Sequence, residues 1–84
     1  MTYSDIYAMR IRHLCQERGI TINKLATLSG LRQSTIDNIL RGKSQNPKAR
    51  TLHKIATVFG MTLSEFLDFP ELNDYSIDDE EDED

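Results

Sequence analysis

Residues 25–40 read LATLSGLRQSTIDNIL, and this stretch decides the fold. Two short amphipathic segments lie on either side of Gly30, and a turn containing glycine between two such segments is typical of a helix-turn-helix. Ala26 lies four residues before the glycine, where a small side chain lets the second helix cross closely. Ile36 and Ile39 share one face of the second segment and are expected to pack against the first. The stretch therefore predicts a helix-turn-helix.

Apolar residues at helical spacing continue on both sides of this motif. The expected helices span residues 4–18, 22–28, 33–41 and 48–59, and a fifth opens at the capping box Thr62-Leu63-Ser64-Glu65 and ends at Phe69-Pro70. No alternating strand pattern and no repeat is present. The sequence predicts a compact all-α domain of five helices.

Charge divides the chain into two unlike parts. Residues 1–70 hold all 10 Lys and Arg and 5 of the 14 acidic residues, so their formal charge is +5 despite the whole-chain value of −4. Residues 71–84 hold the other 9 acids and no base. A basic body with an acidic end is typical of proteins that bind nucleic acid. We expect a domain at 1–70 and a disordered acidic tail at 71–84.

The same composition excludes other classes. A chain of 84 residues leaves no room for a cleft between domains. A single cysteine, Cys15, excludes a disulfide framework, and it is expected to be a small buried hydrophobe. His13 and His53 have no second His or Cys at helical spacing, so we expect no metal and no cofactor. No membrane span or signal segment is recognisable, which favours a soluble cytoplasmic protein. The sequence shows no nucleophile–base pair, no paired carboxylates in a cleft and no metal or phosphate-loop motif, so we do not expect an enzyme.

The motifs resemble the Cro/cI-type (XRE) helix-turn-helix family of phage repressors and bacterial transcriptional regulators. The resemblance covers about residues 5–69, through IRHLCQERGITINKLATLSGLRQSTIDNILRGKSQNP and TLHKIATVFGMTLSEFL. It implies a five-helix, lambda-repressor-like domain whose third helix reads DNA. The family's base-reading positions fall on Gln33, Ser34 and Asn38, and Arg32 and Asp37 lie alongside them as further candidates for base contacts.

The side chains at these positions suit base recognition. Gln33 and Asn38 can each pair with adenine N6 and N7, and Ser34 can serve several bases. Phosphate contacts are expected at the start of the second helix, on the third helix and in the loop that follows it. The expected phosphate-binding residues are Thr21, Asn23, Thr35, Lys43, Ser44, Asn46 and Lys48. Arg10, Arg12, Lys24 and Arg50 could equally bind phosphate or simply face solvent, whereas Arg18 and Lys54 are expected to be surface residues.

Two departures from the family pattern matter. Ile22 stands where members often have a Gln that contacts the DNA backbone or braces the third helix. Cys15 and Leu40 stand where many members bury an Arg–Glu pair, and replacing both partners by apolar groups is often neutral or stabilising. We predict that Cys15 and Leu40 touch.

The function expected from these residues is sequence-specific binding of double-stranded DNA by a transcriptional regulator, most simply a repressor that occupies a palindromic operator. A homodimer could form through the region Phe66 to Leu72. The alternative is a protein-interaction module of the antitoxin or anti-repressor type, whose acidic tail binds a basic partner. The tail itself could be inert, dock another protein or compete with DNA for the basic face.

Overall fold

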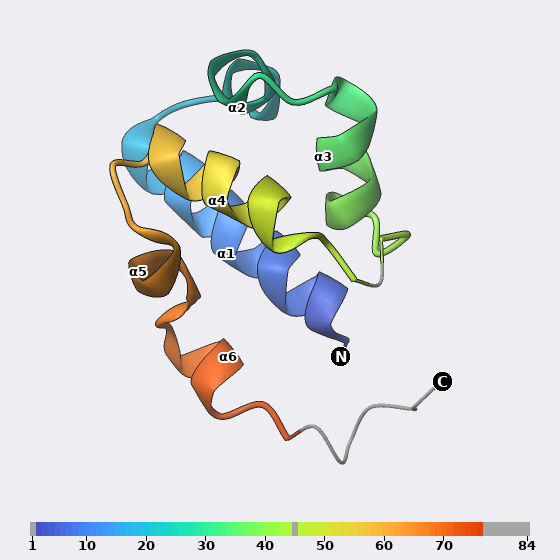
Figure 1. Ribbon diagram of the computed structural model, residues 1–84, viewed down its shortest axis with the longest axis vertical. Helices are drawn as coiled ribbons and strands as arrows, with labels where there is room; N and C mark the ends of the chain where they lie inside the picture. Colours follow the sequence, from blue (N-terminus) through green and yellow to red (C-terminus); the bar gives the residue numbers. More distant parts are fainter. Residues whose placement is uncertain (1, 45, 77–84) are drawn as a thin grey trace.

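The computed structural model describes residues 2–44 and 46–76, and this part of the chain is entirely helical (Figure 1). Its six helices are α1 (Tyr3–Arg18), α2 (Ile22–Ser29), α3 (Gln33–Leu40), α4 (Ala49–Val58), α5 (Leu63–Leu67) and α6 (Pro70–Asn73). The predicted all-α fold is confirmed, and the five expected helices agree with α1 to α5 to within one or two residues. The short helix α6 was not predicted.

Helices α1 and α4 run through the middle of the bundle, with α2 and α3 at one end and α5 and α6 at the other (Figure 1). The core is built from the apolar residues that the helical spacing placed inward. The large side chains among them with an exposed fraction of 0–1% are Ile6, Ile11, Leu25, Ile36, Ile39, Ile55 and Phe66. Every helix except α6 contributes to this list, so one core holds the bundle together.

Three helices begin with a threonine whose hydroxyl accepts a bond from the first turn. Thr2 accepts from the Asp5 N–H at 3.3 Å, Thr21 from the Lys24 N–H at 3.0 Å, and Thr62 from the Glu65 N–H at 3.1 Å. The Asp5 and Glu65 carboxylates in turn accept a bond from the backbone N–H of Thr2 and Thr62, respectively. This bond is the main cause that lowers the pKa of each carboxyl. The capping box predicted at Thr62 is confirmed.

Arg10 holds α5 and α6 against α1. Its Nε donates to the Phe66 carbonyl at 3.0 Å and its Nη2 to the Glu65 carbonyl at 3.1 Å. Its guanidinium carbon also lies 4.9 Å from the centre of the Phe69 ring. Two carbonyls at the end of α5 thereby gain a side-chain donor, so Arg10 links segments that are distant in the sequence.

The ordered body continues beyond Pro70, where the tail was expected to begin. Proline at the first turn suits the start of α6, since that position needs no backbone donor. The Tyr75 ring then packs edge-on against the Tyr3 ring at 4.8 Å. Residues 71–76 therefore belong to the described fold, whereas the expectation of disorder for residues 77–84 lies outside the described residues.

Cys15 is 4% exposed and belongs to the core, and Leu40 is half-buried and packs against the same core. Both therefore face inward, as the replacement of an ion pair by apolar groups requires. Their direct contact stays a prediction. Across residues 2–44 and 46–76, no helix combines the length and the apolar character needed to cross a membrane.

Candidate nucleic-acid interface

Helices α2 and α3 are joined by the turn that the sequence predicted. Gly30 adopts the left-handed conformation at φ 73°, which glycine reaches at little cost, and its N–H donates to the Thr27 carbonyl at 3.3 Å. Leu25 and Ala26 are buried on one side of the turn, and Ile36 and Ile39 on the other. Packing between the inner faces of α2 and α3 thus fixes the angle between the two helices.

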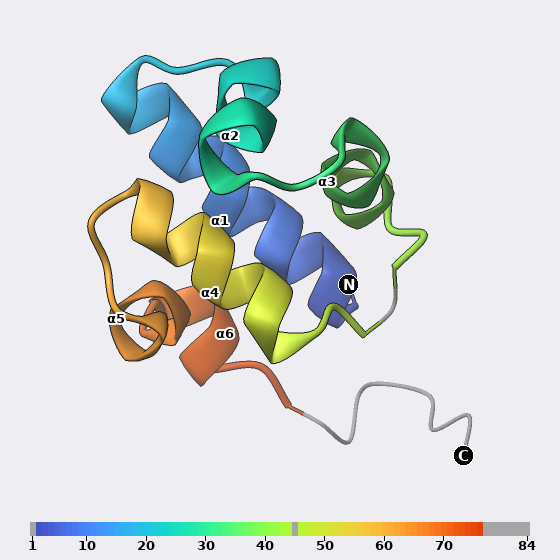
Figure 2. The same ribbon diagram turned by 45° about the horizontal axis from the view of Figure 1, so that its top comes forward.

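Helix α3 lies at the edge of the molecule (Figure 2). Arg32, Gln33, Ser34 and Asn38 are exposed. Thr35 and Asp37 are half-buried, and Gln33 Nε2 donates to Asp37 Oδ1 at 3.2 Å. The outer face therefore carries amide, hydroxyl and charged groups of the kinds that contact base edges in a major groove.

The loop after α3 is tied directly to that helix. The Asn38 carbonyl accepts from the Lys43 N–H at 2.8 Å and from the Ser44 N–H at 3.0 Å, so the loop turns back along the end of α3. Lys43, Asn46 and Lys48 are exposed and Ser44 is half-buried. The predicted loop residues thus follow α3 closely, and Lys48 stands at the start of α4.

The start of α2 bears the remaining predicted phosphate contacts. Thr21 Oγ1 accepts the capping bond from Lys24, which leaves the hydroxyl hydrogen available to donate to a phosphate. Asn23 is exposed, and Ile22 is half-buried against the core. Ile22 therefore contributes packing at a position where a glutamine would contribute a polar contact.

A buried serine that the sequence analysis missed fixes the far end of α3. Ser4 is 0% exposed, and its Oγ donates to the Ile39 carbonyl at 3.2 Å. This bond joins the first turn of α1 to the last turn of α3 across 35 residues. No sequence signal could have paired them, because a serine near a helix start is ordinarily interpreted as a cap.

The arginines and lysines whose role was open divide into two groups. Arg10 is bound to carbonyls of α5. Arg18 is exposed, as expected, and it also donates to the Phe59 carbonyl at 3.1 Å. Both are structural. Arg12, Lys24 and Arg50 are exposed, so phosphate binding remains a prediction for these three.

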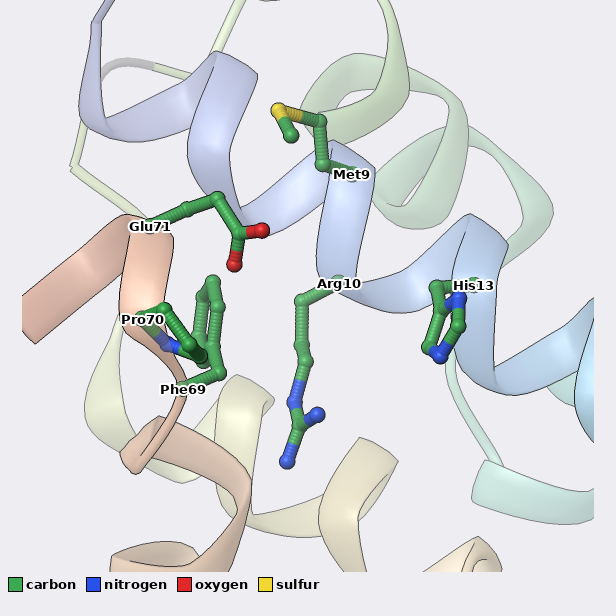
Figure 3. A pocket seen from close by; sticks show the side chains of 6 residues that line it. All are labelled: Met9, Arg10, His13, Phe69, Pro70 and Glu71. Atoms are coloured by element: carbon green, nitrogen blue, oxygen red, sulfur yellow. The ribbon is translucent and has the colours of Figure 1, made fainter.

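A hollow of about 270 Å³ lies between α1 and α6 (Figure 3). Its lining residues are Met9, Arg10, His13, Phe69, Pro70 and Glu71. The Arg10 guanidinium on its floor is already bound to backbone carbonyls, and the exposed His13 pairs with the exposed Glu17 at 3.1 Å. Two of the polar side chains that line the hollow, Arg10 and His13, therefore already have partners within the protein.

Other reactive groups are few in the part of the chain that the structure describes. Burial raises the pKa of the Cys15 thiol, which keeps it in the unreactive protonated form. Among residues 2–44 and 46–76, no three His, Cys, Asp or Glu side chains lie together in a group able to hold a metal ion.

Known proteins resemble this chain in both sequence and structure. A family model for the Cro/C1-type helix-turn-helix DNA-binding domain matches residues 10–71. The HTH-type transcriptional regulator PuuR of Escherichia coli (strain K12) is 38% identical over 65 residues, which cover 77% of this chain and 35% of that protein. The HTH-type transcriptional repressor RghR of Bacillus subtilis (strain 168) is 40% identical over 52 residues, which cover 62% of this chain and 38% of that protein.

A crystal structure of the prophage Lp1 protein 11 has the same fold, with a TM-score of 0.79 and 33% identity over 87% of this chain and 96% of that one. The matched segments span 35–38% of the two curated regulators, so the likeness to those proteins concerns one part of each. The family is one of DNA-binding domains and not of enzymes. The match over residues 10–71, on a helix-turn-helix with an exposed polar second helix, shows that this chain belongs to the Cro/C1-type helix-turn-helix family.

Proposed function

We propose that this chain is a sequence-specific transcriptional regulator of the cytoplasm that binds double-stranded DNA with α3 in the major groove. The observation that carries the proposal is the face of α3, where Gln33, Ser34 and Asn38 are exposed on a helix held by α1 and α2. Arg32 and Asp37 flank them. The groups exposed on this face are those that distinguish base pairs at their major-groove edges.

Phosphate contacts would come from both sides of α3. Thr21 and Asn23 lie at the start of α2, Thr35 lies on α3, and Lys43 to Lys48 follow its end. Such contacts set the register of the protein on the duplex and carry no base information. The basic body, with a formal charge of +5 over residues 1–70, would supply the salt-dependent attraction.

Repression by occupancy of an operator is the simplest regulatory mode for this chain. The printed name of the relative RghR, a transcriptional repressor, supports it. A palindromic operator would require a homodimer through the region Phe66 to Leu72. The side chains of Phe66 and Phe69 are buried within the protomer, at 0% and 5% exposed, so the contact surface would consist of Leu67, Leu72 and the neighbouring exposed Met9.

Binding of the full chain to a randomised duplex pool at several salt concentrations, followed by sequencing of the retained DNA, tests the proposal. We expect one enriched motif and an affinity that falls steeply with salt. Asn38→Ala should reduce the free energy of DNA binding by about 1–3 kcal/mol and lower the base preference at one position of the site. Lys43→Ala should weaken binding to all sequences alike and reduce the slope of log affinity against log salt concentration by about one. Lys54→Ala on α4 is the control, and it should change neither the affinity for the enriched motif nor its dependence on salt.

The protein-interaction alternative predicts the opposite result in the same experiment. No duplex would be retained even at low salt, and a basic protein would instead bind the chain through the acidic residues after Pro70. Substitutions on α3 would then leave partner binding unchanged.

A further inference from the structure

The amide of Gln33 is oriented by a neighbour on its own helix. Its Nε2 donates to Asp37 Oδ1 at 3.2 Å, one helical turn further on, and both side chains lie on the outer part of α3. A carboxylate can only accept hydrogen bonds, so the amide must turn its nitrogen, and not its oxygen, toward Asp37. One of the two amide hydrogens is therefore occupied before any DNA arrives.

This bond changes which base Gln33 can recognise. A free glutamine amide is versatile, because it can offer one donor and one acceptor to adenine N7 and N6, or two donors to guanine N7 and O6. With one hydrogen given to Asp37, a single donor and the carbonyl oxygen remain. That pair complements adenine and leaves one of the two guanine acceptors unsatisfied.

The charge of Asp37 acts in the same direction. Guanine presents only hydrogen-bond acceptors, N7 and O6, at its major-groove edge. The Asp37 carboxylate, one helical turn from the Gln33 contact, would repel the partial negative charge of these acceptors. Adenine N6 presents hydrogens instead. The hydrogen bond to Asp37 and the charge of Asp37 thus both disfavour guanine.

We propose that Asp37 is the residue that makes Gln33 select adenine over guanine. The inference rests on the proposed function, because it assumes that α3 lies in the major groove. Asp37 would act as a positioning residue: it holds the amide in one orientation, and Gln33 makes the contact to the base. Within the described residues, no comparable side-chain bond restrains Asn38, which provides an internal comparison.

The experiment uses the full chain and the motif enriched from the duplex pool. Gln33→Ala first identifies the base position that depends on Gln33, and affinities are then measured for duplexes with A or G there. We expect wild type to prefer A by roughly 10- to 100-fold, the usual cost of one mismatched pair. Asp37→Ala should reduce this ratio to about 3-fold or less, since the freed amide can donate both hydrogens to guanine.

Asn38→Ala is the matched control, because it removes a predicted base contact on the same helix and should leave the A-to-G ratio at the Gln33 position unchanged. Far-ultraviolet circular dichroism and thermal unfolding verify that each variant is folded. A wild-type preference for G at that position, or an undiminished ratio in Asp37→Ala, overturns this inference alone. Failure of wild type to enrich any motif overturns the proposed function as well.

Discussion

Single side chains fix the position of α3 on the bundle, and Ser4 is the clearest example. Its hydroxyl is fully buried and donates to the Ile39 carbonyl at the end of α3. The same carbonyl accepts from the Gly42 N–H at 3.2 Å, so the serine supplements a turn bond and does not act alone. A polar group in the core is tolerated because it has a partner.

Ser4→Ala should lower the free energy of unfolding by about 1 kcal/mol, the usual net worth of one hydrogen bond whose acceptor keeps another partner. Denaturant unfolding monitored by circular dichroism measures this, with the exposed Ser64→Ala on α5 as control. Because α3 would be less firmly held, duplex affinity should fall as well. Equal stability of the two variants would show that the Ser4 bond contributes nothing.

At the scale of elements, the ends of the helices are secured by contacts of two kinds. Local capping boxes start α1 and α5, and their residues are three apart in the sequence. The end of α5 depends instead on Arg10, which lies 55 and 56 residues away from the carbonyls it binds. The first kind is visible in the sequence, and the second depends on how α1 and α5 pack.

Arg10→Met should destabilise the domain by about 2 kcal/mol, because hydrogen bonds from a charged donor are lost and the carbonyls of α5 are left without this partner. Methionine keeps an apolar side chain beside Phe69, so the loss of packing is small. Arg12→Met is the matched control, since Arg12 is an exposed arginine on the same helix. Chemical unfolding that gave the same midpoint for both variants would contradict the structural role of Arg10.

The capping box at Thr62 predicts an acid-dependent stability. The backbone N–H of Thr62 lowers the pKa of Glu65 in the folded protein, so the folded state favours the ionised carboxylate. Its contribution is therefore complete above the unfolded pKa of about 4.3 and is lost as the pH falls through the lower folded value.

Glu65→Gln should make stability less sensitive to pH below about 4.3, because its amide oxygen can still accept from Thr62 but carries no titrating proton. Asp5→Asn should act in the same way at α1, where the bond from Thr2 lowers the pKa of Asp5. Thermal unfolding from pH 3 to pH 7 measures both. If the unfolding temperature of each variant depended on pH as steeply as that of wild type, the capping carboxylates would be ruled out as a source of acid sensitivity.

At the scale of the whole molecule, the last described residues lie near the start of α1. The Tyr75 ring packs on Tyr3, and the next residue of α1, Ser4, is bonded to the end of α3. Seven consecutive acidic residues begin at position 78, three residues after Tyr75 in the sequence. The negative charge of these seven residues would oppose the approach of a polyanion to the protein.

Replacing Asp and Glu at positions 78–84 by Asn and Gln, in a chain of unchanged length, should therefore increase duplex affinity several-fold at low salt. The gain should shrink as salt rises, since the screening length falls from about 30 Å at 0.01 M to about 10 Å at 0.1 M. Equal affinities at every salt concentration would instead favour an inert end or one that docks another protein.

Helices α1 to α5, the turn at Gly30 and the polar face of α3 could all be predicted from the sequence. These features follow from apolar spacing, threonine caps and a glycine, all of which act over a few residues. The pair Gln33–Asp37 could also have been found, because side chains four apart on a helix are neighbours. Helix α6 was missed because four residues after a proline give too short a pattern, and its position depends on packing.

Only the tertiary structure decided which polar residues are structural and which remain available. Arg10 and Arg12 are two residues apart on one helix, yet Arg10 is bound to distant carbonyls and Arg12 is exposed. Ser4 lies next to a capping residue, yet it bonds across the core to α3. The physical reason is that these partners lie 35 to 56 residues away, so the contacts exist only after hydrophobic burial has brought the helices together.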